Sequence, residues 1–223
     1  MKILIKTLFI ALAVTIPATS FCVGANIVTR MPDVYQYEFK ATDALKNIDL
    51  NKNDDEMGEF ISDFMFGKQG KFQLLIEDED RPQPVFTENE MSAVANARKY
   101  MNIVAALGFV ACVLMVVSFI MLKKYEFNRE IRKQFKLGAI IYVCLIVGYL
   151  VGFYVAAKTG HSLLDMLGYV PDEEDLLPRI MTEGLQTRLY YSTAVVSTII
   201  MAIMGYAMFK ITEPKRIFSR SYY

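Results

Sequence analysis

The sequence of 223 residues has no tryptophan, one histidine and three cysteines, and these shortages narrow the possible chemistry. A Ser-His-Asp or Cys-His device would have to use His161, and the chain contains no Gly-x-Ser-x-Gly nucleophile elbow. Cys22, Cys112 and Cys144 show no paired spacing, so neither a disulfide framework nor a zinc ligand set follows. We therefore expect no metal and no cofactor.

Charged residues are missing from three long stretches, residues 102–122, 137–157 and 189–209. A helix needs about 20 mostly apolar residues to cross the hydrocarbon core of a membrane, because its backbone amides must bond within the segment. Each stretch has this length, so the sequence predicts three membrane-spanning helices. None of them holds an Asp, Glu, Lys, Arg or His near its centre, which disfavours transport.

A fourth apolar run extends from Ile3 to Val28, although Lys6 and Pro17 interrupt it. A basic start, a short apolar core and the small residues at 18–20 also fit a cleaved signal peptide. Apolar residues continue past that candidate cleavage site, which favours a retained span. Under either interpretation the following segment lies outside the cytoplasm.

Basic residues predict the orientation of the spans. The connection from Lys123 to Lys136 holds six Lys or Arg residues and only two acidic residues, so it is expected to be cytoplasmic. Lys2 and Lys6 near one terminus and Lys210 near the other agree with this topology. The N- and C-termini of this multi-pass cell-membrane protein are then cytoplasmic. We attribute the basic loop to this retention and to anionic lipid, and expect no nucleic-acid partner.

The first outer segment has the patterns of a small folded domain. Residues 34–39 and 72–76 are rich in strand formers and predict two strands. Asn53 can cap a helix with an acidic first turn and an apolar stripe, formed by Met57, Phe60, Ile61, Phe64 and Met65. Thr87 and Glu90 have capping-box spacing and predict a helix that continues into the second span.

The predicted fold class is mainly α and integral to the membrane, with four transmembrane helices and a small α+β extracytoplasmic domain between helices 1 and 2. The predicted order is a first span at 1–28, the outer domain at 29–100, a second span at 101–123, a basic cytoplasmic loop at 124–136, a third span at 137–157, a second outer segment at 158–188, a fourth span at 189–209 and a basic cytoplasmic tail at 210–223. In the second outer segment, Pro171 to Glu174 is expected to open a short helix.

Two further patterns have plain structural explanations. The oxygen-bearing residues from Asp49 to Asp55 resemble the start of an EF-hand loop, but the sixth position is Asp54 instead of Gly and the twelfth is Phe60 instead of Glu. We interpret that segment as a helix start. The small residues within the spans are interpreted as helix-packing positions, with Gly148 and Gly152 as a small-xxx-small pair.

The arrangement as a whole resembles the bacterial membrane-protein family that includes the lipoprotein intramolecular transacylase. The resemblance covers nearly the full chain and depends on four segments, Asn26–Tyr35, Phe60–Phe64, Phe86–Ser92 and Asp175–Glu183. It implies a four-helix enzyme that moves an acyl chain from the diacylglycerol of a lipoprotein to the amine of its N-terminal cysteine, at the outer leaflet. Such chemistry needs a base for the amine and donors for an oxyanion.

The sequence departs from the transacylase pattern at one expected histidine. That pattern has a Glu at the position of Glu90, followed by His and then Asp at three-residue intervals, and here those two positions are Ala93 and Asn96. The second histidine of the pattern matches His161. Alanine cannot carry a proton, so a mechanism shared between two histidines cannot operate unchanged.

Three hypotheses follow. The chain is a non-catalytic relative, or a divergent acyl-transfer enzyme acting on lipoproteins or lipids, or a structural partner of another envelope protein. We place the non-catalytic relative first, because losing one proton carrier costs about 10² to 10⁴ in rate. For an enzyme, the candidate catalytic residues are His161, Glu90 and Asp165. Membrane lipid is the expected partner, with lipoproteins as a further possibility, and the sequence leaves the oligomeric state open.

Overall fold

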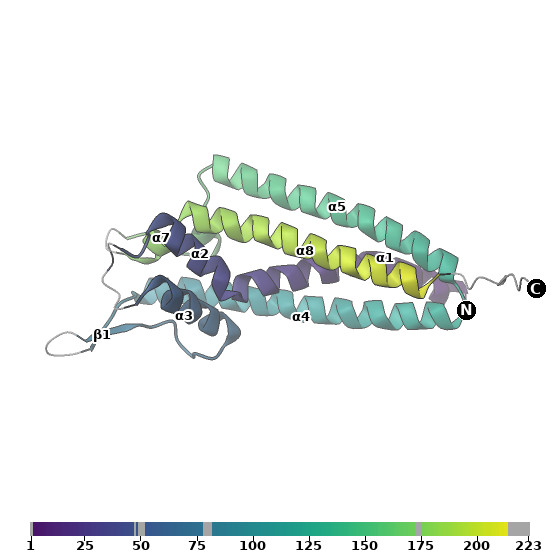
Figure 1. The fold of residues 1–223 in the computed structure, drawn as a ribbon, viewed down its shortest axis with the longest axis horizontal. Helices are drawn as coiled ribbons and strands as arrows, with labels where there is room; N and C mark the ends of the chain where they lie inside the picture. The colour runs from purple at the N-terminus through teal and green to yellow at the C-terminus, as the bar shows by residue number, and fades with distance from the viewer. Residues whose placement is uncertain (1, 47, 49–51, 78–81, 173–174, 214–223) are drawn as a thin grey trace, which may run out of the picture.

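The computed structural model describes residues 2–46, 48, 52–77, 82–172 and 175–213. Most of these residues are helical (Figure 1). The elements in order are α1 (Lys2–Arg30), α2 (Pro32–Thr42), α3 (Asp54–Phe66), β1 (Leu75–Glu77), β2 (Pro82–Pro84), α4 (Glu88–Lys124), α5 (Asn128–Lys158), α6 (Leu163–Met166), α7 (Leu177–Ile180) and α8 (Glu183–Ile211).

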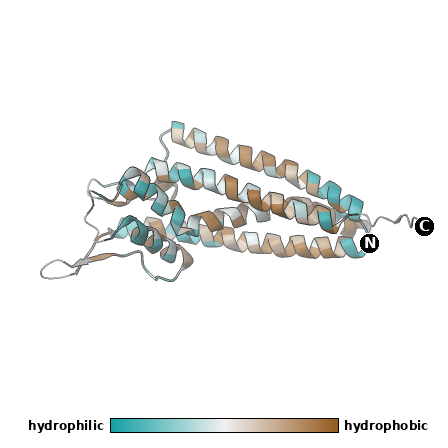
Figure 2. Cartoon of the chain, viewed as in Figure 1, coloured by the Kyte–Doolittle hydropathy of each residue, from teal (hydrophilic) through white to brown (hydrophobic). Residues whose placement is uncertain are grey.

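Four helices, α1, α4, α5 and α8, are long and apolar enough to cross a membrane. Apolar residues cover them along most of their length, and polar residues gather at the two ends of the bundle (Figure 2). The predicted integral membrane protein with four spans is therefore confirmed. The domain boundaries derived from the sequence stay predictions, and the predicted cytoplasmic tail lies outside the described residues from position 214 onward.

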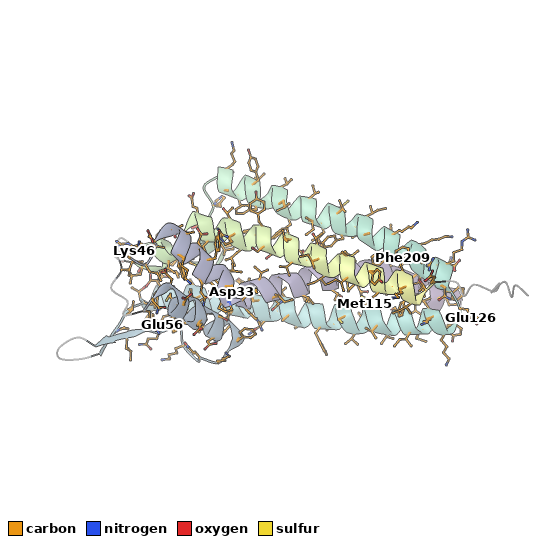
Figure 3. All side chains as sticks on the ribbon, in the orientation of Figure 1. Asp33, Lys46, Glu56, Met115, Glu126 and Phe209 are labelled. Carbon is orange, nitrogen blue, oxygen red and sulfur yellow. The ribbon has the colours of Figure 1, made fainter. Side chains whose placement is uncertain are left out.

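Helix α1 forms the centre of the bundle and contacts α4, α5 and α8. It continues unbroken through residues 18–20 to Arg30 and buries more of its apolar length than the other three. Small residues permit the contacts of α1: a Cβ atom at Gly108 of α4 would lie 2.8 Å from the Cβ of Cys22, and one at Gly24 would lie 2.7 Å from the Cβ of Ser197 on α8. Met115 and Phe209 lie along the spans (Figure 3).

Gly148 and Gly152 do not pack against another helix of the chain, contrary to the small-xxx-small interpretation. A Cβ atom added at either position would meet nothing within 4 Å, and both residues are exposed on α5. The pattern was wrong here because residue size cannot show which side of a helix faces a neighbour.

The described parts of the segments 31–87 and 159–182 lie together at one end of the bundle, which we call the domain end (Figure 1). The start of α1 and the end of α8 lie at the opposite end (Figure 1). Asp33 and Glu56 are at the domain end, whereas Glu126 is at the other (Figure 3). The first residues of α1 and the last residues of α8 therefore lie on the same side of the membrane. Which side this is stays a prediction.

The predicted strand at residues 34–39 is wrong, because these residues belong to α2. Pro32 stands in its first turn with Asp33 beside it, and Tyr35, Glu38 and Phe39 form one buried face at helical spacing. The strand expected at 72–76 is only β1, three residues that pair antiparallel with β2. The α+β prediction for the outer domain is thus not supported, since the described part is helical apart from this short hairpin.

The starts of α3 and α4 are as predicted. Asn53 and Glu56 form a capping box at α3, and the apolar stripe from Met57 to Met65 is buried. Phe72 packs against three other phenylalanines, Phe60, Phe64 and Phe86, at the centre of the domain core. Residues 49–51 of the EF-hand-like segment lie outside the described residues.

The domain is joined to the bundle by an ion pair. The Nε of Arg188 on α8 donates to the Oε2 of Glu38 on α2 at 2.8 Å, and Glu38 is buried. The second outer segment adds the short helices α6 and α7, of which α7 begins at Leu177 and α6 was not predicted. Residues 173–174 of the predicted helix opening lie outside the description.

Candidate functional site

Besides Glu38, two further carboxylates, Glu90 and Asp175, are buried at the domain end of the bundle. Glu90, in the first turn of α4, is completely shielded from solvent. Its Oε2 accepts a hydrogen bond from the backbone N–H of Thr87 at 2.8 Å, which completes the capping box of α4. Its Oε1 accepts from the backbone N–H of Leu177 at the start of α7. The carboxylate therefore joins α4 to a segment almost ninety positions away in the sequence.

Asp175 is the second of these two carboxylates. Its Oδ2 accepts from the hydroxyl of Tyr169 at 2.6 Å and from the backbone N–H of Asp172 at 3.2 Å. Its Oδ1 accepts from the hydroxyl of Thr87 at 3.1 Å. Burial, and then the hydrogen bond to Asp175, raise the pKa of Tyr169, so this tyrosine stays protonated at neutral pH.

Neither Asp175 nor Tyr169 was a candidate from the sequence. Asp175 stands beside two leucines shortly after a proline. This local sequence does not show that the carboxylate is buried, because its burial depends on the residues that contact it. Those partners, Thr87 and Tyr169, come from different parts of the chain. Only the fold brings them together.

Ala93 lies one turn after Glu90, at the position where the transacylase pattern has a histidine. It is buried in an apolar cluster with Leu164, Tyr169 and Leu177. Asn96, one turn further along α4, donates from Nδ2 to the backbone carbonyl of Leu167 at 3.1 Å. This part of α4 thus holds the second outer segment by packing and hydrogen bonds.

His161 lies at a separate place, on the loop after α5. It follows Gly160, whose φ of +74° is a conformation that glycine adopts without strain. The imidazole is exposed and lines a pocket of about 150 Å³ together with Ser162, Glu183 and Gln186. No residue in the described part of the chain forms a hydrogen bond with its ring.

Asp165 lies in the first turn of the short helix α6, completes the capping box with the N-cap residue Ser162, and does not line the pocket of His161. Its Oδ2 accepts from the backbone N–H of Ser162 at 2.8 Å, and its own N–H donates to the hydroxyl of Ser162 at 3.2 Å. The structure thus does not unite the three predicted residues: Glu90 is buried beside α7, Asp165 belongs to a capping box, and His161 shares its pocket with Glu183 instead. The described residues include no group of three metal-ligating side chains.

The fold and this site define a four-span integral membrane protein with a mainly helical domain at one end. Comparison of the sequence with protein-family models gives no match, and neither does comparison with curated proteins.

Solved structures with the same fold are those of the membrane integral lipoprotein intramolecular transacylase Lit from Bacillus cereus. One has a TM-score of 0.68 at 12% identity, covering 95% of this chain and 97% of that one. Variants of the same protein, in which a histidine is replaced by arginine or by alanine, give TM-scores of 0.69 and 0.65 at 12% and 14% identity and cover 94% of this chain and 92% and 93% of theirs. The predicted resemblance is therefore confirmed for the fold.

Proposed function

We propose that this chain is a non-catalytic relative of the transacylase that acts at the outer membrane–water interface, with both termini in the cytoplasm. The observation that carries this proposal is the environment of Ala93. At the position where a proton carrier would be needed, the side chain is a methyl group packed among Leu164, Tyr169 and Leu177. An apolar cluster of this kind holds no group that can take a proton from an attacking amine.

The neighbouring carboxylate supports the same conclusion. A general base must reach the proton that it removes, within hydrogen-bond distance or through one water. Both carboxylate oxygens of Glu90 already accept backbone N–H groups, and the side chain is completely buried. Glu90 therefore serves as a structural link between α4 and α7.

A second candidate function, divergent acyl transfer to lipoproteins or lipids, is favoured by one observation. His161 shares a pocket with Glu183 at the domain end of α5 and α8, where an imidazole with a carboxylate nearby can act as a base. In this alternative Glu183 takes the orienting role that the sequence suggested for Asp165 or Glu90. The site would then lie outside the Ala93 cluster.

The experiment that separates the two functions uses a bacterium that lacks lipoprotein N-acylation and produces a reporter lipoprotein. We expect mass spectrometry to find the amine of the reporter's N-terminal cysteine free when this chain is expressed. Expression of the Bacillus cereus transacylase is the positive control, in which the same amine should be acylated. Membrane expression is verified by immunoblot. An N-acylated reporter whose modification is lost in His161→Ala but kept in Thr159→Ala would overturn the proposal and support the divergent enzyme.

An unmodified reporter leaves a binding role with membrane lipid, lipoproteins or another envelope protein. Crosslinking in intact cells with a photoreactive residue at Glu183, compared with the same residue at the lipid-facing position Val151, would then show whether a protein partner contacts the pocket of His161.

A further inference from the structure

A groove of about 660 Å³ lies between α1 and α4, separate from the pocket of His161 between α5 and α8. Along the spans its walls are apolar and include Val23, Ile27 and Phe109. Its floor is closed because α1 and α4 touch at Gly108 and Cys22. A groove with apolar walls inside the hydrocarbon region takes an acyl chain, since neither water nor a polar segment is stable there.

Arg30 stands at the domain end of this groove, as the last residue of α1. Its Nη2 donates to Asn102 at 2.8 Å, but its Nε is buried and has no partner. No carboxylate in the described part of the chain lies within ion-pair distance of Arg30. The charge of Arg30 therefore has no counter-ion among the described residues, and an anion from outside the chain can supply one.

A second cation, Lys68, lies near Arg30 but is already paired. Its guanidinium lies 5.7 Å from the ring centroid of Phe66, and the ammonium of Lys68 lies 5.8 Å from the same centroid. Lys68 is paired with Asp63 at 2.6 Å, and both side chains are solvent-accessible. The excess charge here is thus that of Arg30.

Asn26 supplies a second unpartnered atom on the same helix face, one turn before Arg30. Its Nδ2 donates to the carbonyl of Cys22 at 3.0 Å, while its Oδ1 is buried without a partner. Four buried side-chain polar atoms without partners occur among the described residues, and two of them belong to Asn26 and Arg30, which line this groove. Both residues thus bring polar groups to the domain end of a groove that is apolar along the spans.

We infer that this groove binds one anionic phospholipid, with an acyl chain between α1 and α4 and the phosphate on Arg30. A guanidinium at the end of a span matches a phosphate in geometry and charge, and its Nη protons supply the donors. Arg30 holds this lipid in preference to a zwitterionic one because an unpaired cation favours net negative charge. The site does not rest on the proposed function, since it holds whether or not the chain transfers acyl groups.

The absence of tryptophan makes a direct binding measurement possible. In a Phe109→Trp variant the indole is the single tryptophan and lies at the groove, and the protein is reconstituted in vesicles of phosphatidylcholine with increasing brominated phosphatidylglycerol or brominated phosphatidylcholine. We expect quenching by the anionic lipid to saturate at a mole fraction about fivefold lower than quenching by the zwitterionic lipid. A second reporter, Val117→Trp, faces bulk lipid and should show equal quenching by both.

Two further changes in the Phe109→Trp background test the assignment. Arg30→Gln should abolish the anionic preference, whereas Lys99→Gln, which removes an exposed cation elsewhere on α4, should leave it intact. Ala105→Phe should fill the groove and abolish the anionic preference, so that both lipids quench equally as at Val117→Trp, whereas Ala106→Phe, outside the groove, should keep the preference. Equal quenching by the two lipids with Arg30 present, or a preference that survives Arg30→Gln, would overturn the inference.

Discussion

Two carboxylates at the domain end have a structural role, although carboxylates in other proteins often act in catalysis. Glu90 and Asp175 are both buried acids, and between them they accept hydrogen bonds from α4, from α7 and from the loop before it. Burying a carboxylate is costly unless donors surround it. Here those donors are backbone N–H groups and hydroxyls, so each acid fixes the position of the second outer segment on α4.

Replacing Glu90 by Gln tests this structural role. The amide keeps one acceptor oxygen but turns its NH₂ group toward the N–H of either Thr87 or Leu177, so that two donors face each other. We expect Glu90→Gln to lower the free energy of unfolding by about 2 kcal/mol. Equilibrium unfolding in detergent measures this change in the free energy of unfolding, and Glu88→Gln at the exposed neighbouring position is the control. Equal stability of the two variants would contradict the role.

The sequence predicted the hydrogen bonds of Glu90 to nearby residues but not those to distant ones. The spacing of Thr87 and Glu90 indicated a capping box, and that box is present. The hydrogen bond from Leu177 to the same carboxylate could not be foreseen, because no local pattern reports a contact across so long a separation. The grouping of His161, Glu90 and Asp165 into one catalytic site likewise depended on tertiary contacts, and the structure separates them.

At the scale of elements, the same sequence can fit two secondary structures, and packing decides between them. Residues 34–39 alternate well enough for a strand, yet the helix α2 buries Tyr35 and Glu38 together on one face. Tyr35 donates to the carbonyl of Thr29, and Glu38 pairs with Arg188 of α8. Tertiary contacts of this kind override a modest strand propensity, which is why the prediction was wrong there.

Some glycines on the spans face open space and others contact a neighbouring helix, which gives a second prediction. Alanine favours a helix over glycine by about 1 kcal/mol, so Gly152→Ala should be neutral or stabilising where the added methyl meets nothing. At Gly108 the methyl would strike Cys22, and we expect a loss of about 1–3 kcal/mol. Unfolding by titration with a denaturing detergent compares them, with Gly148→Ala as a second open position. A Gly108→Ala variant as stable as Gly152→Ala would show that α1 and α4 do not meet there.

For the whole molecule, the distribution of charge sets the expected orientation. The spans could be predicted from the sequence because hydrocarbon tolerates so few alternatives to a long apolar helix. The order in which they pack could not, and the central position of α1 emerges only from the fold. The cationic connection between α4 and α5 lies at the end of the bundle away from the domain (Figure 1).

Single-cysteine labelling on intact cells tests that orientation. With Cys22, Cys112 and Cys144 replaced by alanine, new cysteines at the exposed positions Glu88 and Arg129 report on opposite ends of the bundle. A membrane-impermeant maleimide should label Glu88→Cys at once and Arg129→Cys only after the membrane is opened, because basic connections stay in the cytoplasm. Immediate labelling of Arg129→Cys alone would invert the topology, and equal labelling of both would refute the spans.

Helix α4 has no break between its cap at Thr87 and its last residue, Lys124. At a rise of 1.5 Å per residue, the part that precedes the apolar stretch stands on the order of 20 Å clear of the hydrocarbon. A continuous helix of this kind fixes the distance between the bilayer and a molecule that binds to the domain. Any tilt that a bound molecule imposes on the helix reappears, with opposite sense, at the end of α4 away from the domain.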